Sequence, residues 1–209
     1  MERAMTGAPV YAWEPEKGVH IGIMPRNGTV DDLRWFQGDP SFVFHPMNAQ
    51  TNGDIVTCDV CEFEEAPLFP TPDGTPGDPS KAIPRLTRWT FDIGQNTKDY
   101  QLERLDDLAC EFPRLDERFA GANYRYGYFA ADMNAQLKVG GFNAIGRREQ
   151  QTDKNELRDV GEACVTKEPV VVPRSADAAE GDGFLLANVY DANRKASHLV
   201  ILDAQNVSG

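Results

Sequence analysis

The 209-residue sequence lacks any run of about 18 apolar residues, which excludes a candidate membrane-spanning helix. No apolar segment follows the first residues, Met1–Met5, so we expect no secretory signal and a cytoplasmic location. Histidine and cysteine are also scarce, with 3 and 4 residues. Each of these side chains can therefore be weighed individually as a metal ligand.

Basic residues are also few relative to acidic ones: the chain has 21 Lys and Arg residues and 33 Asp and Glu residues, and its formal net charge is -12. A surface of this sign repels phosphate backbones and anionic lipid headgroups. We therefore expect no nucleic-acid partner. The composition, 41% hydrophobic and 26% charged, is typical of a folded globular chain rather than a disordered one.

The four cysteines are interpreted as free thiols, as is usual in a reducing compartment. Cys58 and Cys61 have the spacing of half a zinc or redox site. No second pair of ligands follows at zinc-finger spacing, and the motif lies in an extended run rather than at a helix start. We interpret the pair as structural or incidental.

A helical period of 3.6 residues is not sustained for three turns anywhere, and the pattern is instead one of short extended runs rich in Val, Ile, Thr, Phe and Tyr. In 86–93, for example, Thr87, Trp89, Phe91 and Ile93 share one face. The spacing predicts an all-β sandwich, barrel or propeller. The predicted strands are 20–26, 33–37, 42–49, 55–64, 86–93, 100–105, 124–130, 142–148, 156–160, 168–173, 184–191 and 198–203.

The connectors fit that interpretation. Asn52-Gly53 separates two extended runs and predicts a hairpin with a type I′ turn. Pro67–Pro79 is rich in proline and is predicted to be a long exposed loop, and Arg174–Asp182 is a second polar connector. Neither is long enough to link independent cores, so we expect one β unit.

His45 differs from the other two histidines. His20 and His198 lie beside turns and are expected at the surface. In 42–49, an alternation of period two places Phe42 and Phe44 on one face and Val43, His45 and Met47 on the other. Pro46 removes a ladder hydrogen bond, which predicts an edge strand or a bulge. By itself, His45 could be a buried core histidine or a metal ligand.

Three segments together resemble the carotenoid cleavage oxygenase family, which includes the lignostilbene dioxygenases. The first is Phe44–Ala49, which is similar to the family signature Phe-His-x-x-Asn-Ala. The others, Glu111–Phe119 with Tyr124–Tyr128, and Glu180–Leu186 with Val189–Asp191 and Leu199–Ala204, follow in the family's order and resemble its later hallmarks. The resemblance covers nearly the whole chain.

The resemblance implies a seven-bladed β-propeller that holds one non-haem Fe(II) through four histidines. His45 matches the third of these ligands in chain order. Glu111 and Glu180 match two glutamates that hydrogen-bond the ligating imidazoles, an arrangement that fixes the ring tautomer. By this resemblance, oxygen activated at the iron cleaves a carbon–carbon double bond of a carotenoid, apocarotenoid or stilbene into two carbonyl products.

The resemblance also implies O2 and an apolar polyene or stilbene as partners, with possible contact with a membrane surface for substrate uptake. An apolar tunnel is needed to position the substrate. The sequence does not distinguish aromatic residues that line the tunnel from those that pack between blades. The candidates are Phe42, Phe44, Trp89, Phe91, Tyr124, Tyr126 and Tyr128.

The chain supplies one of the family's four histidine ligands. It resembles the later-middle part of such an enzyme, and we expect residues 1–209 to form one partial propeller domain that looks truncated at both ends. Since one imidazole cannot hold Fe(II) tightly, the chain alone is expected to be inactive. A catalytically inactive propeller piece that acts as a structural or interaction module is the alternative, and a sugar-binding β domain, suggested by Trp13, Trp35 and Trp89, ranks last.

Overall fold

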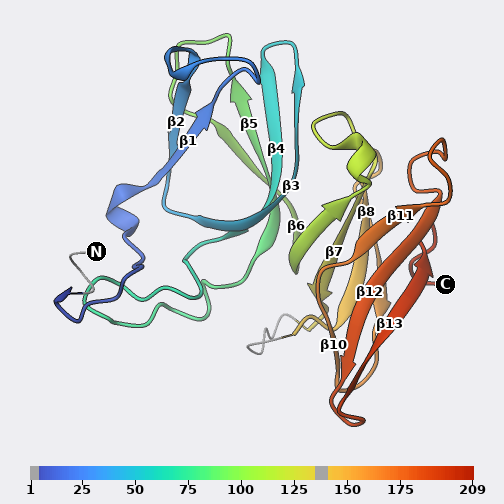
Figure 1. The fold of residues 1–209 in the computed structure, drawn as a ribbon. Coiled ribbons are helices and arrows are strands. Elements are labelled where there is room, and N and C mark those ends of the chain that lie inside the picture. Colours follow the sequence, from blue (N-terminus) through green and yellow to red (C-terminus); the bar gives the residue numbers. More distant parts are fainter. Residues whose placement is uncertain (1–4, 135–140) are drawn as a thin grey trace.

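The computed structural model describes residues 5–134 and 141–209, and its regular elements are antiparallel strands joined by loops (Figure 1). Three single-turn 3₁₀ helices are present: η1 (Pro15–Lys17), η2 (Val30–Asp32) and η3 (Glu117–Phe119). The strands are β1 (Val19–Ile23), β2 (Arg34–Gly38), β3 (Phe42–Asn52), β4 (Ile55–Phe63), β5 (Arg85–Asp92), β6 (Gln101–Leu115), β7 (Tyr126–Asp132), β8 (Ala144–Glu149), β9 (Lys154–Asp159), β10 (Cys164–Thr166), β11 (Val170–Pro173), β12 (Gly183–Asp191) and β13 (Ala196–Asp203).

These strands form three sheets. β1 pairs with β2, and β3 to β9 pair in chain order in one seven-stranded sheet. In the third sheet, β12 pairs with β10 and β11 on one side and with β13 on the other. Each strand within the large sheet neighbours the next along the chain, as short connections favour.

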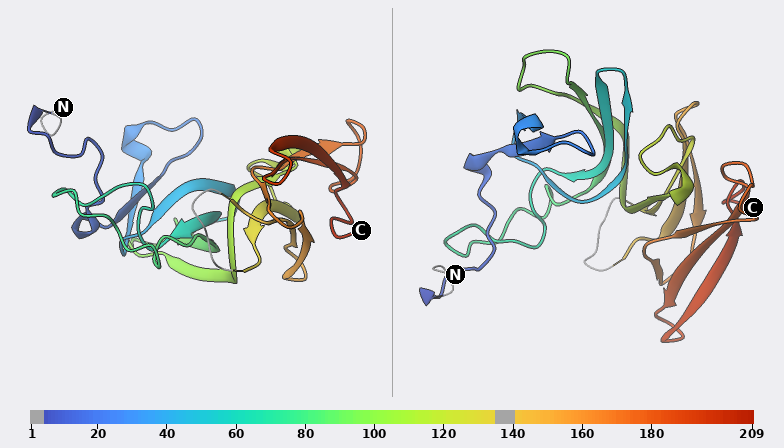
Figure 2. Two further views of the ribbon diagram at one scale, coloured as in Figure 1. Left: turned by 90° about the horizontal axis from the view of Figure 1, so that it is seen from below. Right: turned by 45° about the horizontal axis from the view of Figure 1, so that its top comes forward.

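The long strand β6 divides the seven-stranded sheet into two four-stranded units. Its residues 101–104 pair with β5, whereas residues 109–115 pair with β7, and a register shift separates the two halves. We call β3, β4, β5 and 101–104 the first blade, and 109–115 with β7, β8 and β9 the second blade. The third blade comprises β10 to β13. Figure 1 and Figure 2 show the three blades following one another across the molecule.

β6 of the second blade lies next to β3 of the first blade and β11 of the third. These contacts are additional to those that each strand makes with its sheet partners. This radial succession of small antiparallel sheets is the arrangement of a β-propeller. The side chains of β3 and of the second half of β6 therefore reach a shared region between blades.

The apolar cores link neighbouring units. Met47 and Cys61 of the first blade pack with Phe129 of the second. Between the second and third blades, Tyr128 packs with Leu185 in a further buried cluster. A third cluster joins β2 to the first blade and contains Phe36, Val60, Trp89 and Phe91.

The predicted strands are confirmed with local differences. β6 continues to Leu115, well beyond the predicted end at residue 105, because a bulge interrupts the period of two without ending the strand. β10 was not predicted, since three residues carry too little pattern. The hairpin after β3 is present, but Asn52 pairs with Ile55, so Gly53 and Asp54 form its turn. Gly53 has φ 60 and Asp54 has no positive φ, which fits a type II′ turn rather than type I′.

The strand that carries His45 lies at the edge of the seven-stranded sheet, as Pro46 predicted. The expected alternation of faces does not hold through it, because register shifts flank Pro46. Phe44 and His45 consequently line the same cavity. Within the described ranges, no helix could serve as a membrane-spanning segment.

Candidate metal centre

His45 is placed on the open side of the first blade. β3 has a strand partner, β4, on one side only, and the shifts around Pro46 turn the backbone at the histidine. The His45 side chain is 44% exposed, so it is neither fully buried in the core nor free of contacts. The interpretation of His45 as a buried core histidine is therefore wrong.

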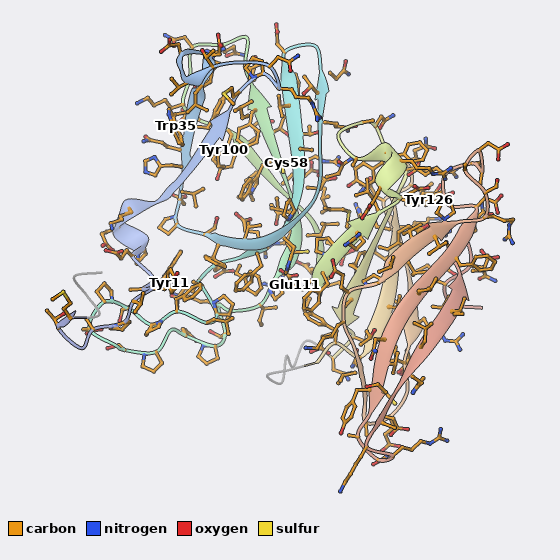
Figure 3. All side chains as sticks on the ribbon, in the orientation of Figure 1. Tyr11, Trp35, Cys58, Tyr100, Glu111 and Tyr126 are labelled. Atoms are coloured by element: carbon orange, nitrogen blue, oxygen red, sulfur yellow. The ribbon has the colours of Figure 1, made fainter. Side chains whose placement is uncertain are left out.

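Glu111 approaches His45 from the second blade. It lies on β6 immediately before Phe112, whose φ of 55 marks the bulge between Glu111 and Arg114. Its Oε2 is 2.7 Å from His45 Nδ1, and the same oxygen accepts from the Phe112 N–H. The Glu111 side chain is only 6% exposed. Figure 3 labels Glu111 between the first and second blades.

This pairing assigns the roles of the ring nitrogens. A carboxylate accepts, so His45 donates from Nδ1–H, and Nε2 is the nitrogen left for a further ligand. A metal-ligating histidine commonly has its second nitrogen held by a carboxylate in this way. Burial raises the pKa of the Glu111 carboxyl, while the bonds from Phe112 N–H and His45 oppose the rise. Glu111 Oε1 is buried and has no hydrogen-bond partner among the described residues.

A cavity of about 550 Å³ adjoins the pair and is lined mostly by apolar groups. Its lining residues come from β3, the end of β4 and the loop that follows it, β6, the segment just before β8, and the end of β10. They are Phe44, His45, Phe63, Ala66, Pro67, Leu68, Gly77, Asp78, Pro79, Ala82, Pro84, Glu111, Phe112, Gly141, Phe142, Thr166 and Lys167. The proline-rich loop thus closes one side of the cavity beside His45.

The aromatic residues singled out from the sequence separate into two groups. Phe44 lines the cavity, and Phe42 packs on it with ring centroids 4.6 Å apart. The other five belong to the apolar cores: Trp89, Phe91, Tyr124, Tyr126 and Tyr128. Three lining phenylalanines were missed, namely Phe63, Phe112 and Phe142. Only Phe112 lay in a recognised motif, so no sequence signal marked the other two.

Glu180 occupies a different environment from Glu111. Its Oε1 accepts from the backbone N–H groups of Arg125 and Tyr126 at 2.6 and 2.9 Å, at the start of β7. The structure therefore does not bring Glu180 to His45. The residue ties the loop before β12 to the second blade, and no bond between Glu180 Oε2 and a described residue is observed.

The other two histidines lie away from the cavity. His20 Nε2 is 3.0 Å from Lys17 O, and its Nδ1 is 3.1 Å from Gln37 Nε2. His198 lies exposed on β13. Both were expected at the surface, and this is confirmed. Within residues 5–134 and 141–209, no group of three His, Cys, Asp or Glu side chains could hold a metal ion.

The Cys58-x-x-Cys61 motif does not form a metal or redox site. A spacing of three turns the two side chains to opposite faces of β4. Cys61 packs with Cys110 between the first and second blades, and Cys58 packs against the core beneath β2. Burial raises the pKa of the Cys58 thiol to about 11, and all four cysteines are free. The incidental interpretation fits these positions.

Asn48 has a structural role that the sequence did not reveal. It is buried, and its Oδ1 accepts from Gly121 N at 2.9 Å, while its Nδ2 donates to Ala122 O at 3.0 Å and more weakly to Phe119 O at 3.4 Å. These backbone groups belong to the loop between β6 and β7. Asn48 therefore fastens the strand of His45 to the blade of Glu111.

Comparisons with known proteins agree on the relationship. The sequence model of the family described as retinal pigment epithelial membrane protein, RPE65, matches residues 1–209. An isoeugenol monooxygenase of Pseudomonas putida is 39% identical, over 98% of this chain and 45% of that protein. Isozyme III of lignostilbene-alpha,beta-dioxygenase from Sphingomonas paucimobilis is 36% identical, over 99% of this chain and 45% of its own length.

Solved structures give the same picture. The crystal structure of Pseudomonas brassicacearum lignostilbene dioxygenase superposes with a TM-score of 0.92 at 30% identity, covering 99% of this chain and 45% of that one. A cobalt-substituted Synechocystis ACO superposes with a TM-score of 0.80 at 28% identity, over 93% and 40%. The expected all-β partial propeller is confirmed. The chain spans less than half the length of these relatives.

Proposed function

Because the chain belongs to the retinal pigment epithelial membrane protein (RPE65) family, we propose that it forms part of an Fe(II)-dependent oxygenase. The enzyme cleaves a carbon–carbon double bond with O2 and gives two carbonyl products. The observation that carries the proposal is the bond between His45 Nδ1 and Glu111 Oε2 beside an apolar cavity.

The residues present fit one part of an iron site. His45 offers Nε2 as a ligand because Glu111 occupies the other ring nitrogen. A neutral imidazole is a suitable donor for Fe(II). Bound iron supplies the activation of O2. The remaining donors are proposed to come from parts of the protein outside the described residues, since these hold no cluster of three.

Glu111 is proposed as the positioning residue for His45. Its carboxylate fixes the Nδ1–H tautomer and the orientation of the ring. Glu180 is proposed to hold a second ligating imidazole through Oε2, because only its Oε1 is occupied by the backbone of β7. The two glutamates lie on different segments, which suits a centre shared by several blades.

The proposed substrate is an aryl alkene with a conjugated, largely apolar body, of the isoeugenol or stilbene class rather than a long carotenoid. Two of the more similar relatives carry isoeugenol and lignostilbene in their names. Phe44, Phe63, Phe112 and Phe142 provide aromatic surfaces beside His45 that can pack against a conjugated ring. These residues bind and orient the double bond and exclude water from it.

Two further expectations remain proposals. Residues 1–209 are proposed to form one partial propeller unit in a cytoplasmic protein, supported by the shared cores and the free thiols. Contact with a membrane surface during substrate uptake is proposed at the cavity mouth, where Leu68 is 71% exposed.

The test uses the full product of the gene that encodes this chain, reconstituted with Fe(II) without oxygen. We expect about one iron per protein, and oxygen uptake with isoeugenol or a stilbene that yields two carbonyl products. The 209-residue chain alone is expected to bind no stoichiometric iron. If the full product bound no iron, the oxygenase proposal would be wrong. The alternative, an inactive structural or interaction module, would then replace it, in keeping with the one histidine among the described cavity residues.

A further inference from the structure

The lining of the cavity beside His45 includes a lysine. Lys167 is the one Lys or Arg among the described lining residues. It follows Thr166, the last residue of β10, which is fully buried and donates from Oγ1 to Asn188 O at 3.3 Å. The anchored threonine fixes the backbone at this point, while Lys167 itself is exposed. Lys167 therefore belongs to the cavity lining and is also accessible to solvent.

The carboxylates around this lysine already have partners. Glu168 accepts from Arg114 Nη1 at 2.8 Å, and Asp78 Oδ1 accepts from Ser80 N and Oγ at 2.9 and 2.8 Å. Glu111 is engaged by His45. None of the described residues forms an ion pair with Lys167. Lys167 is thus the cationic side chain of the described lining and is free to pair with an anion, although the Asp78 and Glu111 carboxylates belong to the same lining.

We propose that Lys167 binds a carboxylate at one end of the substrate, with the conjugated body of the molecule extending into the cavity towards His45. This inference rests on the proposed function, since it names the substrate class for the same cavity. A carboxylate is favoured over a phenol because it is ionised at neutral pH, whereas a phenol titrates near pH 10. Pairing at one end would fix which double bond lies beside His45.

The lysine has two separable effects on such a ligand. An ammonium–carboxylate pair adds affinity for the anion, and it adds less in high salt because the mouth is open to solvent. The apolar walls bind the rest of the molecule irrespective of its charge. A charged probe and its neutral ester therefore distinguish the lysine from the walls.

The experiment measures equilibrium binding of trans-stilbene-4-carboxylate and its methyl ester to the purified protein without iron, by probe fluorescence. Lys167→Gln is expected to weaken binding of the carboxylate by about 3- to 10-fold, as a partly exposed pair allows, and to leave the ester unchanged. Lys167→Arg is expected to bind both probes within about twofold of the original protein. Lys154→Gln, which removes an exposed lysine away from the cavity, is the matched control.

Three results would overturn the inference. They are an equal loss for acid and ester, no loss for the acid, and no saturable binding of either probe. In the full gene product loaded with iron, Lys167→Gln should raise KM for the carboxylate with kcat unchanged. Iron content is expected not to depend on Lys167, which is not among the proposed iron ligands, so a failure of this inference and a failure of the oxygenase proposal give different results.

Discussion

His45 and Glu111 form a hydrogen bond of 2.7 Å although 66 positions separate them in the chain. The two residues come from neighbouring blades, His45 from β3 and Glu111 from the second half of β6. The bond can form only when these blades are docked. The orientation of the imidazole is thus a property of the blade interface rather than of either strand alone.

Replacing Glu111 by Gln tests this dependence. The amide keeps the size of the side chain but removes the charge that holds Nδ1–H, so we expect metal affinity or activity of the full gene product to fall by about 10- to 100-fold. Iron content and oxygen uptake measure the effect. Glu103→Gln, at an exposed position on the same strand, should change neither. Full iron occupancy with normal turnover in Glu111→Gln would contradict the positioning role.

Replacing His45 by Ala is expected to abolish iron binding, because the ring supplies the only histidine nitrogen in the described cavity. His20→Ala and His198→Ala are matched controls, since both side chains lie at the surface away from the cavity. Metal analysis after anaerobic reconstitution separates these variants. Retained iron in His45→Ala would show that the assignment of the ligand is wrong.

Asn48→Ala is expected to lower the free energy of unfolding by about 1 kcal/mol, because it removes the hydrogen bonds from Gly121 N–H and to Ala122 O that the buried Asn48 side chain makes. Urea unfolding measures the loss. Thr51→Ala, at an exposed position of the same strand, should change stability by less than about 0.5 kcal/mol. Equal effects of the two substitutions would mean that the hydrogen bonds of Asn48 contribute nothing to the free energy of unfolding.

The strands were predictable because alternation and turn residues are local signals. Thr87, Trp89 and Phe91 are indeed all buried on β5, and Pro46 correctly indicated an edge strand. Glu111 was different. A glutamate is by residue type usually solvated, whereas Glu111 is buried in a strand and paired with a distant histidine. Only the family resemblance brought it to the site.

The features that the sequence could not predict depend on tertiary contacts rather than on local pattern. The bulge at Phe112 requires a positive φ, which phenylalanine rarely adopts. The residue type therefore does not predict a bulge at this position. In the sequence, Asn48 has no feature that distinguishes it from other strand residues. Its role depends on the loop after η3, which lies beside it in the fold. Phe63 and Phe142 line the cavity because two remote chain segments meet there. Tertiary packing decides each of these cases.

A buried polar network between the first and second blades offers a further test. Arg88 donates to both oxygens of Asp59 at 2.7 and 2.8 Å, and the Tyr124 hydroxyl donates to the same carboxylate at 2.5 Å. Asp59→Asn is expected to cost about 3 kcal/mol because it leaves the guanidinium poorly paired. Tyr124→Phe is expected to cost about 1 kcal/mol.

The two substitutions should not be additive. Since both remove bonds to one carboxylate, the double variant is expected to lose less than the sum, by about 0.5–1 kcal/mol. A double-mutant cycle in urea measures this coupling. Strict additivity would show that Tyr124 and Asp59 stabilise the interface independently.

Asp116 links stability to pH. Its carboxylate accepts from Arg118 Nε and Nη2, and Arg118 Nη1 donates to Ala176 O and Ala178 O, both at 2.9 Å, in the loop before β12. The hydrogen bonds from the Arg118 side chain hold the pKa of Asp116 below its ordinary value of 3.8. Because the pKa is lower in the folded state, the pair stabilises the protein fully above pH 3.8, and this stabilisation is lost as pH falls through the folded pKa.

Asp116→Asn should therefore be less stable than the original protein at neutral pH, and the difference should shrink below about pH 4. Urea unfolding at a series of pH values measures it. Asp177→Asn is the control: the exposed Asp177 carboxylate accepts from Ser175 Oγ at 2.7 Å, and its pKa is also lowered, but it is not clamped by Arg118. A difference between Asp116→Asn and the original protein that stayed constant down to pH about 2 would show that neutralising Asp116 does not release the loop.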